Sequence, residues 1–124
     1  MFSFTLDENR AHYQIRAYKP GIIQVNEKIL TQSIILSAHQ LIEHWQPEII
    51  SELKSSHLAQ AATLNPSILI IGTGSVLQFP PLEIYGNLIN QGIGIEIMDT
   101  AAACRTFTAL TSENRLVVAA LLLK

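Results

Sequence analysis

Seven residues near the middle of the chain carry side chains or backbone groups that could bind a ligand. They lie in two stretches, 72–74 and 96–105, and strand-like apolar runs occupy 68–71 and 93–98. If these two strands are parallel neighbours, both stretches meet at the edge of the sheet where α/β proteins bind ligands. Glycine N–H groups could hold an anion there, and a carboxylate could move protons. The candidate ligand-binding residues are Gly72, Thr73, Gly74, Glu96, Asp99, Thr100 and Arg105.

The loop Gly72-Thr73-Gly74 also has a purely structural interpretation. A dinucleotide-binding fingerprint needs a third glycine and a helix that begins at once, but Leu77 occupies the third position and Phe79-Pro80-Pro81 delays the helix. A Walker loop needs Gly-Lys-Ser/Thr, which the sequence lacks. We therefore favour a tight turn that lets the strand leave the sheet over a nucleotide cradle.

The charged candidates have two interpretations each. Asp99 ends a strand and begins a helix, so capping of the helix N-terminus is favoured over a catalytic role. Glu96 lies in the middle of a strand, where it either is buried with a partner such as Arg105 or simply faces solvent. The sequence leaves open whether Glu96 or Asp99 pairs with Arg105. Cys104 falls on the helix side that we expect to be buried, so we interpret it as a small core residue and not a reactive thiol.

Other catalytic patterns are missing from the sequence. It contains no nucleophile elbow, no Ser/His/Asp pattern and no paired-carboxylate motif. The four histidines lie in different segments and do not have the spacing of a zinc site. We therefore expect no cofactor and no metal, and we lean toward a protein that is not an enzyme.

Composition and charge restrict the class of protein further. The chain has 124 residues, enough for one ordinary domain with its own core, and 48% of them are hydrophobic while 15% are charged. The net charge is −2 and lysine and arginine form no cluster, so nucleic acid is not expected as a partner. A single cysteine fits a reducing compartment. No apolar run is long enough for a transmembrane helix, and no secretory signal begins the sequence, so we expect a soluble cytoplasmic protein.

A second candidate site is the apolar stretch 76–81. Between Lys54 and Glu96 the only charged residue is Glu83, and this stretch lies within that gap. Loops normally lie on the surface, so an apolar loop is a candidate contact for another protein or a membrane face. The alternative is that its large side chains pack beneath their own helix. The candidate partner-binding residues are Leu77, Phe79, Pro80 and Pro81.

The elements that position these residues follow from hydrophobic periodicity. Strands are predicted at 68–71, 93–98 and 116–123, with helices at 82–91 and 99–111 between them. Leu82, Tyr85, Leu88 and Ile89 fall on one face of the first of these helices. This order predicts βαβ units with right-handed crossovers. A shorter helix is predicted at 57–64, with Ser55 or Ser56 as its N-cap.

The first 50 residues predict a small antiparallel β region. Short strands are expected at 12–18, 22–25, 29–30, 33–36 and 41–45, and Lys19-Pro20-Gly21 gives a turn. Residues 1–9 are expected to form an edge strand or a loose arm. The fold class is therefore α/β, a single domain over residues 1–124. Its central sheet is mixed and mainly parallel with helices on one side, and the N-terminal antiparallel hairpin region extends or covers it.

Three segments and a hairpin carry a family resemblance. The segments Leu69–Gly74, Gly92–Thr100 and Ala101–Phe107, with the 18–26 hairpin, resemble a family of small domains of unknown function that includes the mitochondrial complex I assembly factor 3. The resemblance covers residues 13–123. It implies a single three-layer α/β domain with a central mixed sheet. It also implies a protein partner, such as a membrane complex under assembly.

Two hypotheses about function follow. The first is a non-enzymatic protein-interaction module similar to an assembly factor, which uses the 76–81 loop. The second is a small anionic-ligand binding protein or enzyme, which uses the crevice at Gly72–Gly74 and Asp99. The sequence has no mitochondrial presequence, so a role in complex I assembly is not carried over from the resemblance.

Overall fold

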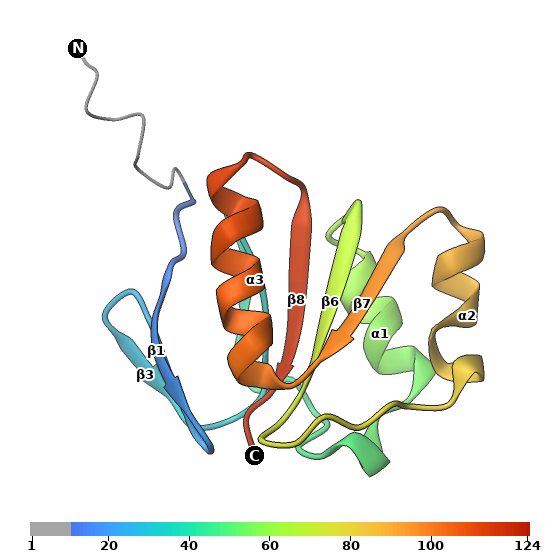
Figure 1. Cartoon of the computed structure of the whole chain (residues 1–124), viewed down its shortest axis with the longest axis horizontal. Helices are drawn as coiled ribbons and strands as arrows, with labels where there is room; N and C mark the ends of the chain where they lie inside the picture. The colour runs from blue at the N-terminus through green and yellow to red at the C-terminus, as the bar shows by residue number, and fades with distance from the viewer. Residues whose placement is uncertain (1–10) are drawn as a thin grey trace.

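A computed structural model describes residues 11–124, which form two β-sheets and three α-helices with a short 3-10 helix (Figure 1). The edge strand or loose arm predicted over residues 1–9 lies outside the described residues. In chain order the elements are β1 (Ile15–Lys19), β2 (Ile22–Val25), β3 (Lys28–Leu30), β4 (Ile34–Ser37), β5 (Leu41–Ile42), η2 (Ile50–Glu52), α1 (Ser55–Ala62), β6 (Ile68–Thr73), α2 (Leu82–Asn90), β7 (Gly94–Met98), α3 (Thr100–Ser112) and β8 (Val117–Leu122).

The central sheet has the strand order β5-β4-β8-β6-β7. β6 lies between β7 and β8 and is parallel to both, whereas β4 is antiparallel to β8. In the β6–β7 pair Gly72 is opposite Met98, so the two strands end at the same edge of the sheet, as the sequence predicts. β8 is buried along its whole length because it is the middle strand and is covered on both faces.

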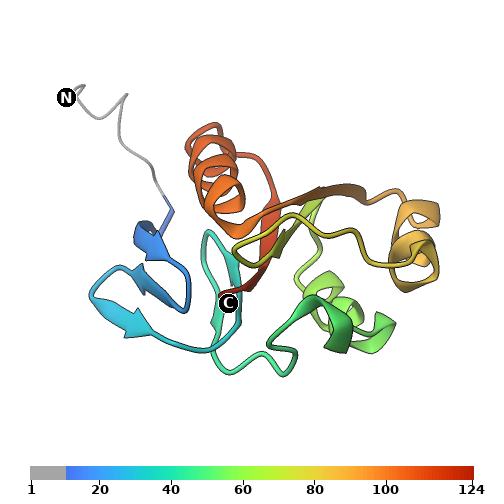
Figure 2. The same ribbon diagram turned by 60° about the horizontal axis from the view of Figure 1, so that its bottom comes forward.

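Helices cover both faces of the central sheet. Alternate residues of β6 point to opposite sides, so Ile70 packs with Phe107 of α3, while Leu69 and Ile71 pack with Leu58 of α1. Figure 2 shows α3 on one side of the sheet and α1 on the other. The prediction of helices on one side was therefore wrong, because the β-branched and leucine runs of β6 and β8 supply two apolar faces that both need covering.

The hairpin region divides between the two sheets. β1, β2 and β3 form a separate antiparallel sheet that packs on the α3 side, with Ile23 and Val25 in the same core as Phe107. β4 and β5 instead join the central sheet beside β8. The small sheet is also tied to the end of β8 by a side chain, since the Tyr18 hydroxyl donates to the carbonyl of Leu123 at 2.9 Å.

Two local predictions about helices need correction. α1 begins at Ser55 with Lys54 as N-cap, because Nδ1 of His57 accepts the Lys54 N–H at 2.9 Å, so neither predicted serine is the cap. The apolar face predicted for α2 is only partly buried.

Ile84, Tyr85 and Leu88 of α2 face the core, whereas Leu82 and Ile89 are 63% and 47% exposed. α2 packs mainly on α1 and on the edge strand β7, so its buried face is narrow. Within residues 11–124 no helix is both long and apolar enough to cross a membrane.

Candidate functional site

The end of β6 meets the start of α3 in a closed hydrogen-bonded junction. The Gly74 N–H donates to Oγ1 of Thr100 at 2.8 Å, and the Thr100 N–H donates back to the Gly74 carbonyl at 2.9 Å. The Thr100 hydroxyl donates to the Leu122 carbonyl at 2.5 Å. Thr100 is fully buried, so these bonds satisfy polar groups that water does not reach. The junction holds β6, β8 and α3 together.

Both glycines of the loop are required by close packing of the chain against itself. A Cβ on Gly72 would lie 2.8 Å from Oγ1 of Thr100 and 2.9 Å from Cδ2 of Leu121. Gly74 has a φ of +100°, and a Cβ there would lie 2.0 Å from the carbonyl oxygen of Lys124. The space in which an anion would have to sit beside these glycines is occupied by the C-terminal residues.

The remaining polar groups of the loop also bind internally. Oγ1 of Thr73 donates to the Val76 carbonyl at 2.8 Å and accepts the Gln78 N–H at 3.2 Å. The Ser75 N–H donates to the Lys124 carbonyl at 3.0 Å. The base of the β6–α2 loop is therefore fixed at several points.

The charged candidates do not converge on one point. Asp99 caps α3, since its Oδ1 accepts the Ala102 N–H at 2.9 Å. Glu96 is exposed on the edge strand β7, and Arg105 is exposed on α3. The ion pairs recorded within residues 11–124 involve none of these three residues. Nor do three or more His, Cys, Asp or Glu side chains gather into a metal-binding group in this part of the chain.

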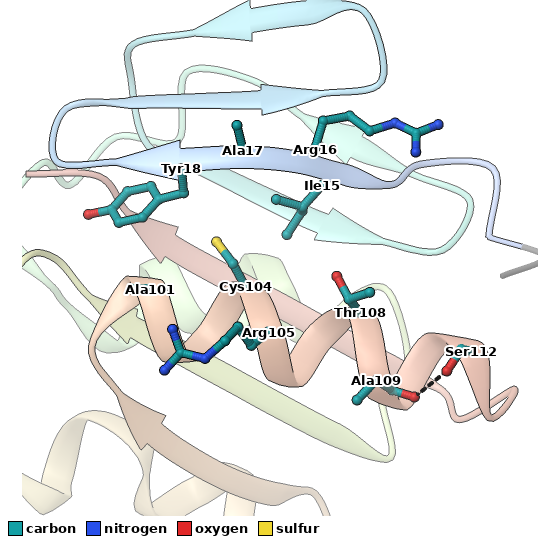
Figure 3. Close-up of a pocket in the computed structure, with 10 residues that line it drawn as sticks. All are labelled: Ile15, Arg16, Ala17, Tyr18, Ala101, Cys104, Arg105, Thr108, Ala109 and Ser112. Carbon is teal, nitrogen blue, oxygen red and sulfur yellow. Dashed lines mark hydrogen bonds between the residues drawn. The ribbon is translucent and has the colours of Figure 1, made fainter.

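A groove of about 520 Å³ lies between β1 and α3 (Figure 3). Ile15 and Tyr18 extend from β1 toward α3, and Cys104 points back toward β1. Arg16 and Arg105 line opposite walls and extend in different directions. The sequence offered no signal for this groove, because β1 and α3 are far apart in the chain.

Cys104 lies in this groove but is only 7% exposed. Burial raises the pKa of its thiol to about 12, and the nearby Arg105 offsets only part of that effect. Burial likewise raises the pKa of Tyr18, with smaller contributions from Cys104 and Asp99. Such a thiol stays protonated near neutral pH, which agrees with the predicted role of Cys104 as a small core residue.

The loop after β6 exposes several apolar side chains. We call its exposed apolar residues, Val76, Leu77, Phe79 and Pro81, the β6–α2 loop surface; the polar residues Ser75 and Gln78 are exposed beside them. Phe79 is 69% exposed and Leu77 is 48% exposed, so the alternative in which they pack beneath their own helix is wrong. Pro80, the remaining candidate of this set, is buried. The loop runs along one end of the molecule, the end at which β6 terminates (Figure 1).

Comparison with known proteins gives consistent matches over most of the chain. A family model described as "Protein of unknown function (DUF498/DUF598)" matches residues 15–122. The "13 kDa major membrane protein" of Francisella tularensis subsp. holarctica is 35% identical over 115 residues, which are 90% of this chain and 93% of that protein.

The protein named NADH dehydrogenase (ubiquinone) 1 alpha subcomplex assembly factor 3 from Danio rerio is 36% identical over 110 residues. These residues are 87% of this chain but 63% of the assembly factor. A solved structure from Bordetella parapertussis is 34% identical with a TM-score of 0.85, covering 90% of this chain and 96% of that one. The matches confirm the resemblance predicted from the sequence, and the solved structure has the same fold.

Proposed function

We propose that this chain, which belongs to the DUF498/DUF598 family of proteins of unknown function, is a non-enzymatic protein-binding module that assists the assembly of a larger complex. The observation that carries the proposal is the β6–α2 loop surface, an exposed apolar and uncharged segment held on a rigid base. Its partner is another protein, either a subunit or a second assembly factor.

The composition of the loop surface favours a protein contact. Residues 74–82 carry no charge, so covering them with a partner leaves no unpaired ion. The large side chains of Phe79 and Leu77 are 69% and 48% exposed. Full burial of an exposed side chain of this kind contributes roughly 1.5–3 kcal/mol, and Phe79 and Leu77 would gain the share of it that corresponds to their exposed area.

The rigid base of the loop favours binding as well. Hydrogen bonds between Thr73 and both Val76 and Gln78, and from Ser75 to Lys124, fix where the loop begins. Pro80 and Pro81 restrict its other end before α2 starts. A loop that is already ordered loses little conformational entropy when it binds, so most of its contact energy is available for affinity.

The relatives agree with this proposal. The Danio rerio protein is named as an assembly factor for NADH dehydrogenase, and the Francisella tularensis protein is named as a membrane protein. This chain spans 63% of that assembly factor.

The proposal is tested by placing a photo-crosslinking residue on the loop surface. Phe79→p-benzoylphenylalanine should crosslink one partner in cells, and the matched control Leu116→p-benzoylphenylalanine should not. Leu116 is 67% exposed but precedes β8, on a different part of the surface. The double substitution Leu77→Asp/Phe79→Asp should abolish co-purification of the same partner while leaving the melting temperature unchanged. If position 79 gives the same crosslinks as position 116, or if the doubly substituted protein keeps its partner, the loop surface is not the contact.

A further inference from the structure

The junction between η2 and α1 contains a hydrogen bond that requires a neutral histidine. His57 lies in the first turn of α1, and its Nδ1 accepts the N–H of the N-cap residue Lys54 at 2.9 Å. The His57 N–H donates back to the Lys54 carbonyl at 3.0 Å. Because Nδ1 is the acceptor, the neutral ring carries its proton on Nε2. The imidazole therefore takes the place that a Glu or Gln side chain takes in a capping box.

Protonation of His57 removes this acceptor. An imidazolium carries an N–H on both ring nitrogens, so its Nδ1 can no longer accept the N–H of Lys54. The new positive charge would also lie at the N-terminus of a helix, where the free backbone N–H groups already carry positive partial charge. Both effects oppose the closed form of the cap when the ring is charged.

The surroundings of His57 favour the neutral ring as well. Burial lowers the pKa of His57 from its ordinary value of 6.5, the charge of Lys54 lowers it further, and Glu52 acts in the opposite direction. α2 and β8 also pack on α1. β8 has no charged residue, and the only one on α2, Glu83, is exposed and is not among the charges that shift this pKa. Neither of these two elements therefore offers a carboxylate that stabilises an imidazolium.

The cap is joined to a buried tryptophan. Trp45 is 2% exposed, and its indole N–H donates to the His57 carbonyl at 3.3 Å. The rings of Trp45 and His57 lie edge to face, with 6.3 Å between their centroids. Leu53 and Leu58, on either side of the cap, belong to the same core as Trp45. Because the chain has a single tryptophan, its fluorescence reports on this junction.

We infer that His57 is a pH-sensitive cap, which holds the η2–α1 junction closed near neutral pH and releases it in mildly acidic solution. Ile49, Ile50 and Ser51, which precede the cap, line a pocket of about 340 Å³ together with Val76. The junction therefore opens beside the β6–α2 loop surface. The inference does not depend on the proposed function, because the cap and its readouts lie within this chain.

The direction of the pH effect follows from proton linkage. The open junction leaves His57 with its ordinary pKa of 6.5, whereas the pKa in the closed junction is lower. As the pH falls from 6.5 to the lower value, the open form binds a proton that the closed form does not. The closed form is therefore most stable above pH 6.5 and loses stability as the pH falls through this window.

Three versions of the full chain test the inference by NMR between about pH 7.5 and about pH 5. In the wild type the Lys54 amide resonance should titrate together with the His57 ring. Its protection from hydrogen exchange, measured against the intrinsic rate at each pH, should fall by at least about threefold. His57→Gln keeps a neutral acceptor at this position, so the Lys54 amide should stay protected throughout. His57→Ala has no acceptor, so protection should be low at every pH.

Trp45 fluorescence gives a second readout, which should change over the same pH range in the wild type and stay constant in His57→Gln. His44→Gln is the matched control and should behave like the wild type, because His44 is next to Trp45 in sequence but its Nδ1 contacts Oε1 of Gln32. The inference is overturned if protection of the wild-type Lys54 amide does not change with pH, or if His57→Gln loses protection as the wild type does. It is also overturned if His57→Ala is protected like the wild type at neutral pH, or if the neutral His57 ring carries its proton on Nδ1.

Discussion

Gly74 is the residue at which the candidate ligand crevice is closed. Its N–H and carbonyl both bind Thr100, and the Lys124 carbonyl lies where a side chain would begin. The glycine loop thus lets three segments of the chain meet, and its backbone groups are used within the protein. This structural use of the loop agrees with the absence of the third glycine and of the immediate helix of a nucleotide-binding motif.

We expect Gly74→Ala to destabilise the protein by more than about 3 kcal/mol, from the clash and the positive φ together. Gly21→Ala is the matched control, because Gly21 has a similar φ of +90° but a Cβ there would meet no atom within 4 Å. The control should cost only about 1–2 kcal/mol, for the left-handed backbone alone. Urea unfolding of the two variants measures the difference. Equal losses would mean that Lys124 does not pack on Gly74.

At the scale of elements, α3 organises the molecule. It begins with the Asp99 cap at the edge where β6 and β7 end, and it lies between the central sheet and the small sheet (Figure 1). Phe107 packs in the core that both sheets share. The same helix forms one wall of the groove opposite β1. Its start is therefore fixed by local capping and its position by contacts with both sheets.

The cap of α3 can be tested by paired substitutions of Asp99. Asp99→Ala removes the acceptor for the Ala102 N–H and should cost about 0.5–2 kcal/mol of unfolding free energy. Asp99→Asn keeps a side-chain oxygen at the cap and should cost much less, since Asn and Asp cap nearly equally well. Chemical denaturation at neutral pH compares them. A loss as large for Asn as for Ala would show that Asp99 contributes through its charge and not through the cap.

At the scale of the whole molecule, two cores share one central sheet. One core joins α3 and the small sheet to one face, and the other joins α1 and α2 to the opposite face. Cys104 belongs to the first core and lies close to β1. Since both cores depend on β8, ionisation of a buried group in one of them should affect global stability.

Global stability should therefore fall at alkaline pH through Cys104. Its thiol has an ordinary pKa of 9.0 and a pKa of about 12 in the folded protein. Between these values the unfolded chain loses a proton that the folded chain keeps, so the free energy of unfolding decreases as pH rises. From about pH 8 to about pH 10.5 the wild type should lose roughly 1–2 kcal/mol more than Cys104→Ala. Urea unfolding across this range measures both proteins, and parallel pH profiles would contradict the prediction.

The sequence alone predicted several strands and the start of α3, because these depend on interactions between residues that are close in the chain. Continuous apolar runs predicted β6 and β8, alternation predicted β7 with its isoleucines on one face, and Asp99 predicted the start of α3. The βαβ order then required parallel strands that end at one edge. The apolar character of residues 76–81 was also visible, because it needs only composition.

Tertiary structure decided everything that depends on contacts between distant segments. The sequence alone left open whether the 72–74 loop is open or filled, and the filling comes from Leu122 and Lys124, at the far end of the chain. It likewise left open which side of α2 faces outward, because α2 packs at the sheet edge and buries only a narrow stripe. Hydrophobic periodicity shows that a helix or strand has an apolar face. Which other element covers that face, and where grooves remain on the surface, is decided by packing between segments that are distant in the chain.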